Sequence, residues 1–146
     1  MRAPQELIDQ VKRQEGLSLT AYQDTLGNWT VGYGHTPAFS GQTITEAQAE
    51  SLLMQDLNSA QTDLLSSLPW CFSLSVPRYC VLWNMCFNMG IGRLLEFRLM
   101  LAAVRNANYE EAAKQMLNSL WAEQVKERAT ELAEQMTTGS WFNPEA

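Results

Sequence analysis

The segment from Glu15 to His35 gathers side chains that are suited to acid–base chemistry. Glu15 is followed nine residues later by Asp24 and six residues after that by Thr30, and the segment ends on the chain's only histidine. Hydrolysis of a glycosidic bond requires two carboxyls in different environments, one protonated to donate to the leaving oxygen and one ionised. A threonine hydroxyl beside them can hold the attacking water.

The spacing of these residues leaves a second interpretation open. A glutamate near a helix end and an aspartate in a turn are common on protein surfaces, and aspartate is a favoured turn residue. We interpret His35 as a structural residue and do not assign it as the catalytic base. The residues alone therefore suggest catalysis without deciding it.

Two short elements are predicted around the carboxyls. Residues 4–15 are expected to form an amphipathic helix that ends at Gly16, and its apolar face consists of Leu7, Ile8 and Val11. Apolar and polar residues then alternate from 21 to 34, with the turn-forming sequence DTLGN at 24–28, which predicts a β-hairpin. Glu15 and Asp24 would then lie on consecutive elements and face one cleft.

The rest of the chain has a helical pattern. Residues 45–68 are predicted to form a long helix that begins with a capping box of Thr45 and Gln48 and ends at Pro69. After a break at 70–75, residues 76–88 are apolar on all sides, which indicates a buried helix with Pro77 in its first turn. Further helices are predicted at 93–105, 109–121 and 123–136.

This order of elements predicts an α+β fold. We expect a single domain with a small β lobe at 15–44, a connecting helix at 45–68 and a helical lobe at 69–146. The helix at 4–15 is expected to pack on the helical lobe. Only ten residues lie between Gly34 and Thr45, so the small lobe should have a reduced third strand.

Composition excludes several classes of protein. Of the 146 residues, 46% are hydrophobic and 18% charged, and the net charge of −6 argues against a nucleic-acid partner. We expect no membrane insertion, because no apolar run approaches the roughly 18 residues that span a bilayer. The polar N-terminus lacks the apolar region of a secretory signal, which predicts synthesis in the cytoplasm. One histidine and three cysteines without a CxxC pair predict no metal, and the thiols are expected to be free and mostly buried.

Residues 15–36, EGLSLTAYQDTLGNWTVGYGHT, resemble the active-site segment of the phage-type, T4-lysozyme-like endolysin family of glycoside hydrolases. The resemblance extends over roughly residues 5–142 and includes the FNMG sequence that begins at Phe87. The family's motif is matched in order by Glu15, Gly16, Tyr22, Asp24, Gly27, Thr30, Gly32, Gly34 and His35.

The resemblance implies a role for each matched side chain. Glu15 would be the general acid, and Asp24 with Thr30 would activate a water on the opposite face of the sugar, which implies inversion. Arg128 would contact Glu15, although a solvated helix charge is the alternative. His35 would pair with Asp56 in a structural ion pair. The implied substrate-binding residues are Tyr33, Gly34, Thr36, Phe87 and Asn88, with a core role equally open for Phe87.

The resemblance also implies a function. The chain would be an endolysin that hydrolyses the β-1,4 bond between N-acetylmuramic acid and N-acetylglucosamine in peptidoglycan glycan strands, without a cofactor. It would be a monomer that leaves the host cytoplasm when a holin permeabilises the membrane, and it would act on the cell wall. A lytic transglycosylase and a catalytically silent wall-binding module are the alternatives, and an origin in a phage tail device stays open.

Overall fold

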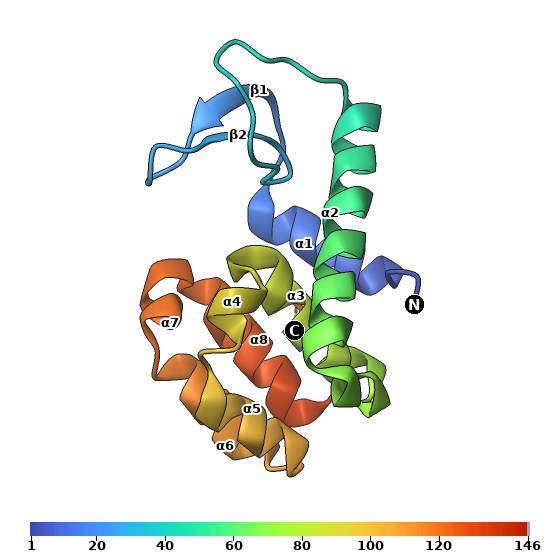
Figure 1. Ribbon diagram of the computed structural model, residues 1–146, viewed down its shortest axis with the longest axis vertical. Helices are drawn as coiled ribbons and strands as arrows, with labels where there is room; N and C mark the ends of the chain where they lie inside the picture. The colour runs from blue at the N-terminus through green and yellow to red at the C-terminus, as the bar shows by residue number, and fades with distance from the viewer. Residues whose placement is uncertain (146) are drawn as a thin grey trace. The chain divides into compact units, whose positions relative to one another are not determined.

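The computed structural model describes residues 1–145, and the chain forms two compact units, Met1–Ser59 and Ala60–Ala146, named here unit 1 and unit 2. Figure 1 shows helices throughout and a two-stranded antiparallel sheet, β1 and β2, in unit 1. The predicted α+β class is confirmed. Among the helices of residues 1–145, none combines the length and the apolar character needed to cross a membrane.

Unit 1 begins with α1 (Gln5–Glu15), which ends at Gly16 as predicted. Leu7 and Val11 on its apolar face are fully buried. Gly16 has a φ of 71°, which a residue without a Cβ adopts readily, so the chain can leave the helix sharply directly after Glu15. The predicted helix and its end are therefore confirmed.

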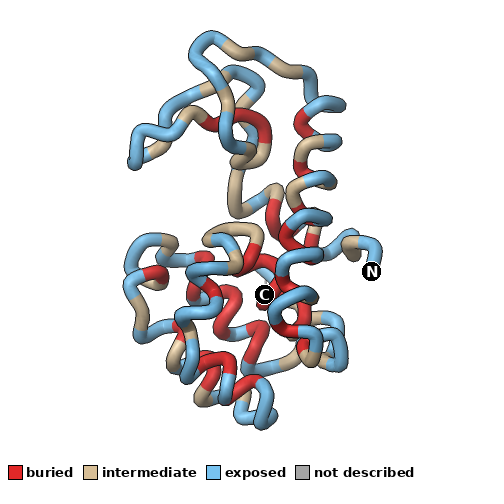
Figure 2. Tube along the Cα trace, viewed as in Figure 1, coloured by how far each residue is buried: buried red, intermediate tan, exposed pale blue. Residues whose placement is uncertain are grey.

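The predicted hairpin is formed by β1 (Ser18–Gln23) and β2 (Trp29–Gly32), with Tyr22 paired to Thr30. Figure 2 shows exposed residues along β1 and the turn, whereas β2 is buried from Thr30 to Gly32. Residues 42–44 add only a bridge beside β1, with Ala21 N donating to Gln42 O and Ile44 N donating to Leu19 O, both at 2.9 Å. This bridge is the reduced third strand that the short connection predicted.

The long helix α2 (Glu46–Ser67) begins with the predicted capping box. Thr45 N donates to Gln48 Oε1 at 2.9 Å and Gln48 N donates to Thr45 Oγ1 at 3.1 Å, so both side chains satisfy backbone donors of the first turn. Pro69 ends the helix, but the break expected at 70–75 is largely a 3₁₀ helix, η1 (Pro69–Ser73). Proline suits the first turn of such a helix because it has no N–H to satisfy there.

Unit 2 is built around α3 (Val76–Met89), in which every residue from Tyr79 to Cys86 is buried. Trp83 is fully buried, and its ring centroid lies 5.7 Å from that of Tyr79. The buried helix and the position of Pro77 in its first turn are confirmed. All three cysteines are free and buried, also as predicted.

The helix predicted at 93–105 is wrong in its extent, because the chain forms α4 (Ile91–Leu94) and α5 (Arg98–Arg105) with a turn between them. Arg98 N donates to Glu96 O at 2.8 Å, and Phe97 has the φ of −76° and ψ of 56° of an inverse γ-turn. The Phe97 ring packs edge-on against Trp121 with centroids 6.1 Å apart. This contact with a distant residue accompanies the break and has no local sequence signal.

The helices predicted at 109–121 and 123–136 are also wrong in their bounds, since three helices cover this region: α6 (Tyr109–Leu117), α7 (Leu120–Val125) and α8 (Glu127–Thr138). Ser119 separates α6 from α7, because its hydroxyl donates to Met116 O and accepts from Ala122 N. Lys126, with a φ of 51°, separates α7 from α8. Helix α6 packs against α5 and α8.

Candidate active site

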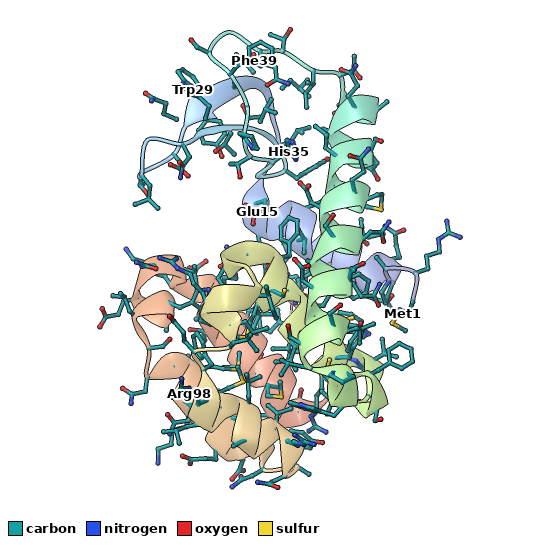
Figure 3. The ribbon with its side chains drawn as sticks, viewed as in Figure 1. Met1, Glu15, Trp29, His35, Phe39 and Arg98 are labelled. Atoms are coloured by element: carbon teal, nitrogen blue, oxygen red, sulfur yellow. The ribbon has the colours of Figure 1, made fainter. Side chains whose placement is uncertain are left out.

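Glu15 is the last residue of α1, and its carboxyl lies against the backbone of Gly34. A Cβ placed on Gly34 would lie 2.6 Å from Glu15 Oε1 and 3.0 Å from Glu15 Cδ. Figure 3 labels Glu15 at the end of α1 and His35 on the turn that follows β2. The structure therefore brings together the proposed general acid and the glycine-rich turn that the sequence placed in one segment.

Asp24 opens the hairpin turn and uses its carboxylate to hold that turn. Its Oδ1 accepts hydrogen bonds from Asn28 N at 2.8 Å and Leu26 N at 2.9 Å, and the Asn28 side-chain amide lies 3.4 Å from Oδ2. These hydrogen bonds, that from the Asn28 backbone first, hold the pKa of the Asp24 carboxyl below its usual range. Asp24 is therefore ionised at neutral pH while it stays partly exposed to solvent.

Thr30 lies on β2 with little exposed surface, and its hydroxyl donates to Asn28 O at 3.2 Å. The same carbonyl accepts a hydrogen bond from Asp24 N at 2.9 Å. Asn28 thus joins Asp24 to Thr30 through its own backbone. Because the Thr30 proton is engaged, the hydroxyl oxygen can accept a hydrogen bond from water.

Asn28 is a residue that the sequence interpretation missed. It appears in the sequence only as the last residue of the turn DTLGN, where its type fits the turn as well as any role in the site. Its backbone N–H and C=O and its side-chain amide all contact Asp24 or Thr30 in the structure. The turn geometry, and not the residue type alone, gives Asn28 this part in the site.

The turn after β2 is closed by two backbone hydrogen bonds, Val31 N to His35 O at 3.0 Å and His35 N to Val31 O at 2.9 Å. His35 Nδ1 lies 2.8 Å from Asp56 Oδ2 on α2, which is the pair that the resemblance implied. The turn is therefore fixed at its base to β2 and at His35 to α2. This arrangement gives His35 a structural contact, in agreement with its interpretation from the sequence.

Lys12 is a second residue that the sequence interpretation missed. Its ammonium lies 5.5 Å from the centre of the Tyr33 ring and pairs with Glu50 at 2.6 Å, so it connects α1, the turn and α2. Tyr33 is partly exposed and Thr36 is exposed. The predicted contacts of Tyr33, Gly34 and Thr36 with substrate stay predictions.

The other predicted site residues belong to unit 2. Phe87 and Asn88 are partly exposed at the end of α3, and Asn88 Oδ1 accepts a hydrogen bond from Trp121 Nε1 at 2.7 Å. Arg128 is buried and donates to Asn84 Oδ1 from Nε at 3.2 Å and Nη2 at 3.0 Å, so it is not a solvated helix charge. Its contact with Glu15 and the substrate contacts of Phe87 and Asn88 stay predictions. Within residues 1–145, no group of three or more His, Cys, Asp or Glu is arranged to hold a metal ion.

Comparison with known proteins identifies the family. The family model described as Phage lysozyme matches residues 12–135, a range that includes Glu15, Asp24 and Thr30. The chain belongs to the phage lysozyme family. The resemblance seen in the sequence is therefore confirmed, and with it a glycoside hydrolase of the peptidoglycan-hydrolysing endolysin type.

Individual relatives of this phage lysozyme chain differ in size. The endolysin of Salmonella phage P22 is 34% identical over 126 residues, which cover 82% of this chain and 83% of the relative. A protein named probable T4-type lysozyme 1 from Dictyostelium discoideum is 28% identical, with 90% of this chain and 94% of the relative covered. The pre-baseplate central spike protein Gp5 of Enterobacteria phage T4 is 31% identical over 92% of this chain, but the match spans only 28% of that protein.

Proposed function

We propose that Glu15, Asp24 and Thr30 hydrolyse the β-1,4 bond between N-acetylmuramic acid and N-acetylglucosamine in peptidoglycan, with inversion at the anomeric carbon. The observation that carries this proposal is the ionised form of Asp24 and its hydrogen bonds with the turn. Its carboxylate is held ionised by hydrogen bonds from the turn, and its backbone N–H donates to the same Asn28 carbonyl that accepts from the Thr30 hydroxyl. An ionised carboxylate beside a hydroxyl that can accept from water is the base half of an inverting glycosidase.

The reaction proceeds in one displacement. The oxygen of a water held by Thr30 and Asp24 forms a bond to C1 of the muramic acid residue while the bond from C1 to the glycosidic oxygen breaks. Glu15 gives its proton to the leaving oxygen, and Asp24 takes a proton from the water. The products are a reducing muramic acid end and a free hydroxyl on glucosamine, and proton exchange with solvent restores both carboxyls.

The remaining predicted residues complete this proposal. Arg128 contacts Glu15, and the His35–Asp56 pair maintains the turn. The glycan strand is contacted by Tyr33, Gly34, Thr36, Phe87 and Asn88. The enzyme works as a monomer without a cofactor.

The proposed setting is host lysis, in which a holin releases the enzyme from the cytoplasm to the cell wall. The endolysin name of the Salmonella phage P22 relative supports this setting. The similarity to the T4 spike protein supports a second one, in which such a chain is one part of a phage tail device. In both settings the proposed partner is the peptidoglycan glycan strand.

A digest of purified peptidoglycan with wild type and Glu15→Gln tests the proposed roles. We expect reducing muramic acid ends from wild type, and a loss of at least about 100-fold for Glu15→Gln, since glutamine has no proton to donate to the leaving oxygen. Mass spectrometry identifies the ends, and proton NMR of the first product distinguishes the α-anomer of inversion from the β-anomer of retention. Glu6→Gln is the matched control, because Glu6 is an exposed residue of the same helix.

Three results contradict parts of this proposal. Anhydro ends would identify a lytic transglycosylase, and a β-anomer would identify a retaining enzyme. The absence of products from folded wild type would favour the alternative function, a catalytically silent wall-binding module. Circular dichroism of both variants establishes that any loss of products is not a loss of fold.

A further inference from the structure

The glycines of unit 1 differ in what occupies the space where a side chain would lie. Gly16, Gly27 and Gly41 have positive φ angles, and a Cβ on any of them would have no heavy atom within 4 Å outside the neighbouring residues. Gly34 has a similar φ of 75°, but its missing side chain leaves the space that the Glu15 carboxyl fills. The requirement for glycine at position 34 is therefore both conformational and steric.

The backbone at Gly34 has little freedom to withdraw from Glu15. The Val31–His35 hydrogen bonds close the turn on both sides of the glycine, and the His35–Asp56 pair ties it to α2. The Glu15 carboxyl, in contrast, is the end of a side chain with three rotatable bonds. If a Cβ were added at position 34, the carboxyl would move and the turn would stay in place.

We propose that Gly34 is a positioning residue that sets the location of the Glu15 carboxyl by offering it a backbone surface without a side chain. This inference rests on the proposed role of Glu15 as general acid. It differs from the role in substrate binding that the resemblance implies for Gly34, because here the glycine acts through Glu15. A displacement of about 1 Å at a reacting group is enough to lower a rate about 100-fold.

Gly34→Ala and Gly41→Ala form a matched pair. Both place an alanine at a positive φ, 75° and 83°, so both suffer similar backbone strain and should lower the melting temperature by similar amounts. Only the alanine at 34 meets Glu15. We expect kcat on purified peptidoglycan to fall about 100-fold for Gly34→Ala with KM nearly unchanged, and both constants to stay near wild type for Gly41→Ala.

The position of the carboxyl can be followed without the reaction. The ¹³C signal of the Glu15 side-chain carboxyl, assigned by its loss in Glu15→Gln, should shift in Gly34→Ala and remain in place in Gly41→Ala. An unmoved signal in Gly34→Ala would overturn this inference and leave the proposed function intact. Turnover by folded Glu15→Gln would instead overturn the proposed function.

The kinetic constants separate positioning from the other roles of Gly34. A raised KM with unchanged kcat would show that the glycine is needed for the substrate to approach. Equal kcat for Gly34→Ala and Gly41→Ala would show that Gly34 does not position the Glu15 carboxyl. Either result overturns the inference. If Gly34→Ala does not fold, removal of the opposing side chain in the double variant Glu15→Ala/Gly34→Ala should restore folding. A double variant that also fails to fold would locate the defect in the backbone and contradict the steric contact.

Discussion

The proposed site in unit 1 and helix α3 in unit 2 are stabilised in different ways. In unit 1 the proposed catalytic residues are held mainly by backbone hydrogen bonds and glycines, and the hairpin turn is open to solvent, with 78% of Leu26 exposed at its tip. In unit 2, α3 is buried over two turns and supports a cluster of aromatic rings. Hydrogen bonds thus position the residues of the site, whereas the burial of apolar side chains stabilises α3.

This difference follows from what each unit has to do. A site that accepts a polymeric glycan must leave its carboxyls accessible, so it cannot be stabilised by burying them. A backbone N–H that donates to a carboxylate fixes the position of the charge and favours its ionised form at the same time. The comparison therefore predicts that substitutions in the hairpin reduce activity more than stability, and that substitutions in α3 do the reverse.

The largest expected effect on stability is that of Trp83→Ala in unit 2. The Trp83 side chain is fully buried against Tyr79, so its removal leaves a cavity and lowers the free energy of unfolding by about 3–5 kcal/mol. Urea denaturation measures the loss, and kcat of the folded fraction should stay near wild type. A loss below about 1 kcal/mol would show that burial in α3 is not what stabilises unit 2.

Asp24→Asn in unit 1 is expected to lower activity while it leaves stability nearly unchanged. The asparagine side-chain oxygen can still accept from the N–H groups of Leu26 and Asn28, so the turn and the stability should be nearly preserved. The amide cannot take a proton from water, and we expect at least about a 100-fold loss of turnover on peptidoglycan. Asp9→Asn, at an exposed aspartate of α1, is the control and should be fully active.

A near-normal rate for Asp24→Asn would contradict its role as the base and would favour a transglycosylase. A large loss of stability would show instead that the charge, and not the hydrogen-bonded shape of the turn, maintains the hairpin. Urea denaturation and the peptidoglycan digest, performed on the same samples, distinguish these results.

The smallest expected effect is on the pH dependence of stability. Because the folded pKa of Asp24 lies below its unfolded value, its ionised form contributes stability that is complete above the unfolded pKa of about 3.9 and is lost as the pH falls through the folded pKa. The difference in unfolding free energy between wild type and Asp24→Asn should therefore shrink from about pH 5 to about pH 2. A constant difference over this range would contradict the lowered pKa.

Much of the fold followed from short-range patterns. The helix that ends at Gly16, the hairpin around DTLGN, the capping box of Thr45 and Gln48, and the buried helix after Pro77 depend on residues within a few positions of one another. Their hydrogen bonds are local, so residue type and spacing suffice to predict them. The carboxyls and Thr30 were located for the same reason, since they share one hairpin and the end of the preceding helix.

The bounds of the later helices did not follow from such patterns. Phe97 lies in the turn between α4 and α5, where its ring contacts Trp121, and Lys126 adopts a positive φ that lysine does not favour. Helix propensity alone predicts a continuous helix through each of these two regions. At Phe97 the break coincides with a contact to a residue far away in the chain, and such contacts override the weak local preference.

The sequence by itself determined the residue types of the site, their order and the elements that present them, because these depend on local hydrogen bonding and on the period of apolar residues. Only the tertiary structure placed the Glu15 carboxyl against Gly34 and the Lys12 ammonium beside Tyr33. These contacts depend on how the turn, the strands and the helices pack in three dimensions. Packing brings together residues that lie far apart in the chain, so their positions in the sequence do not predict that they are in contact.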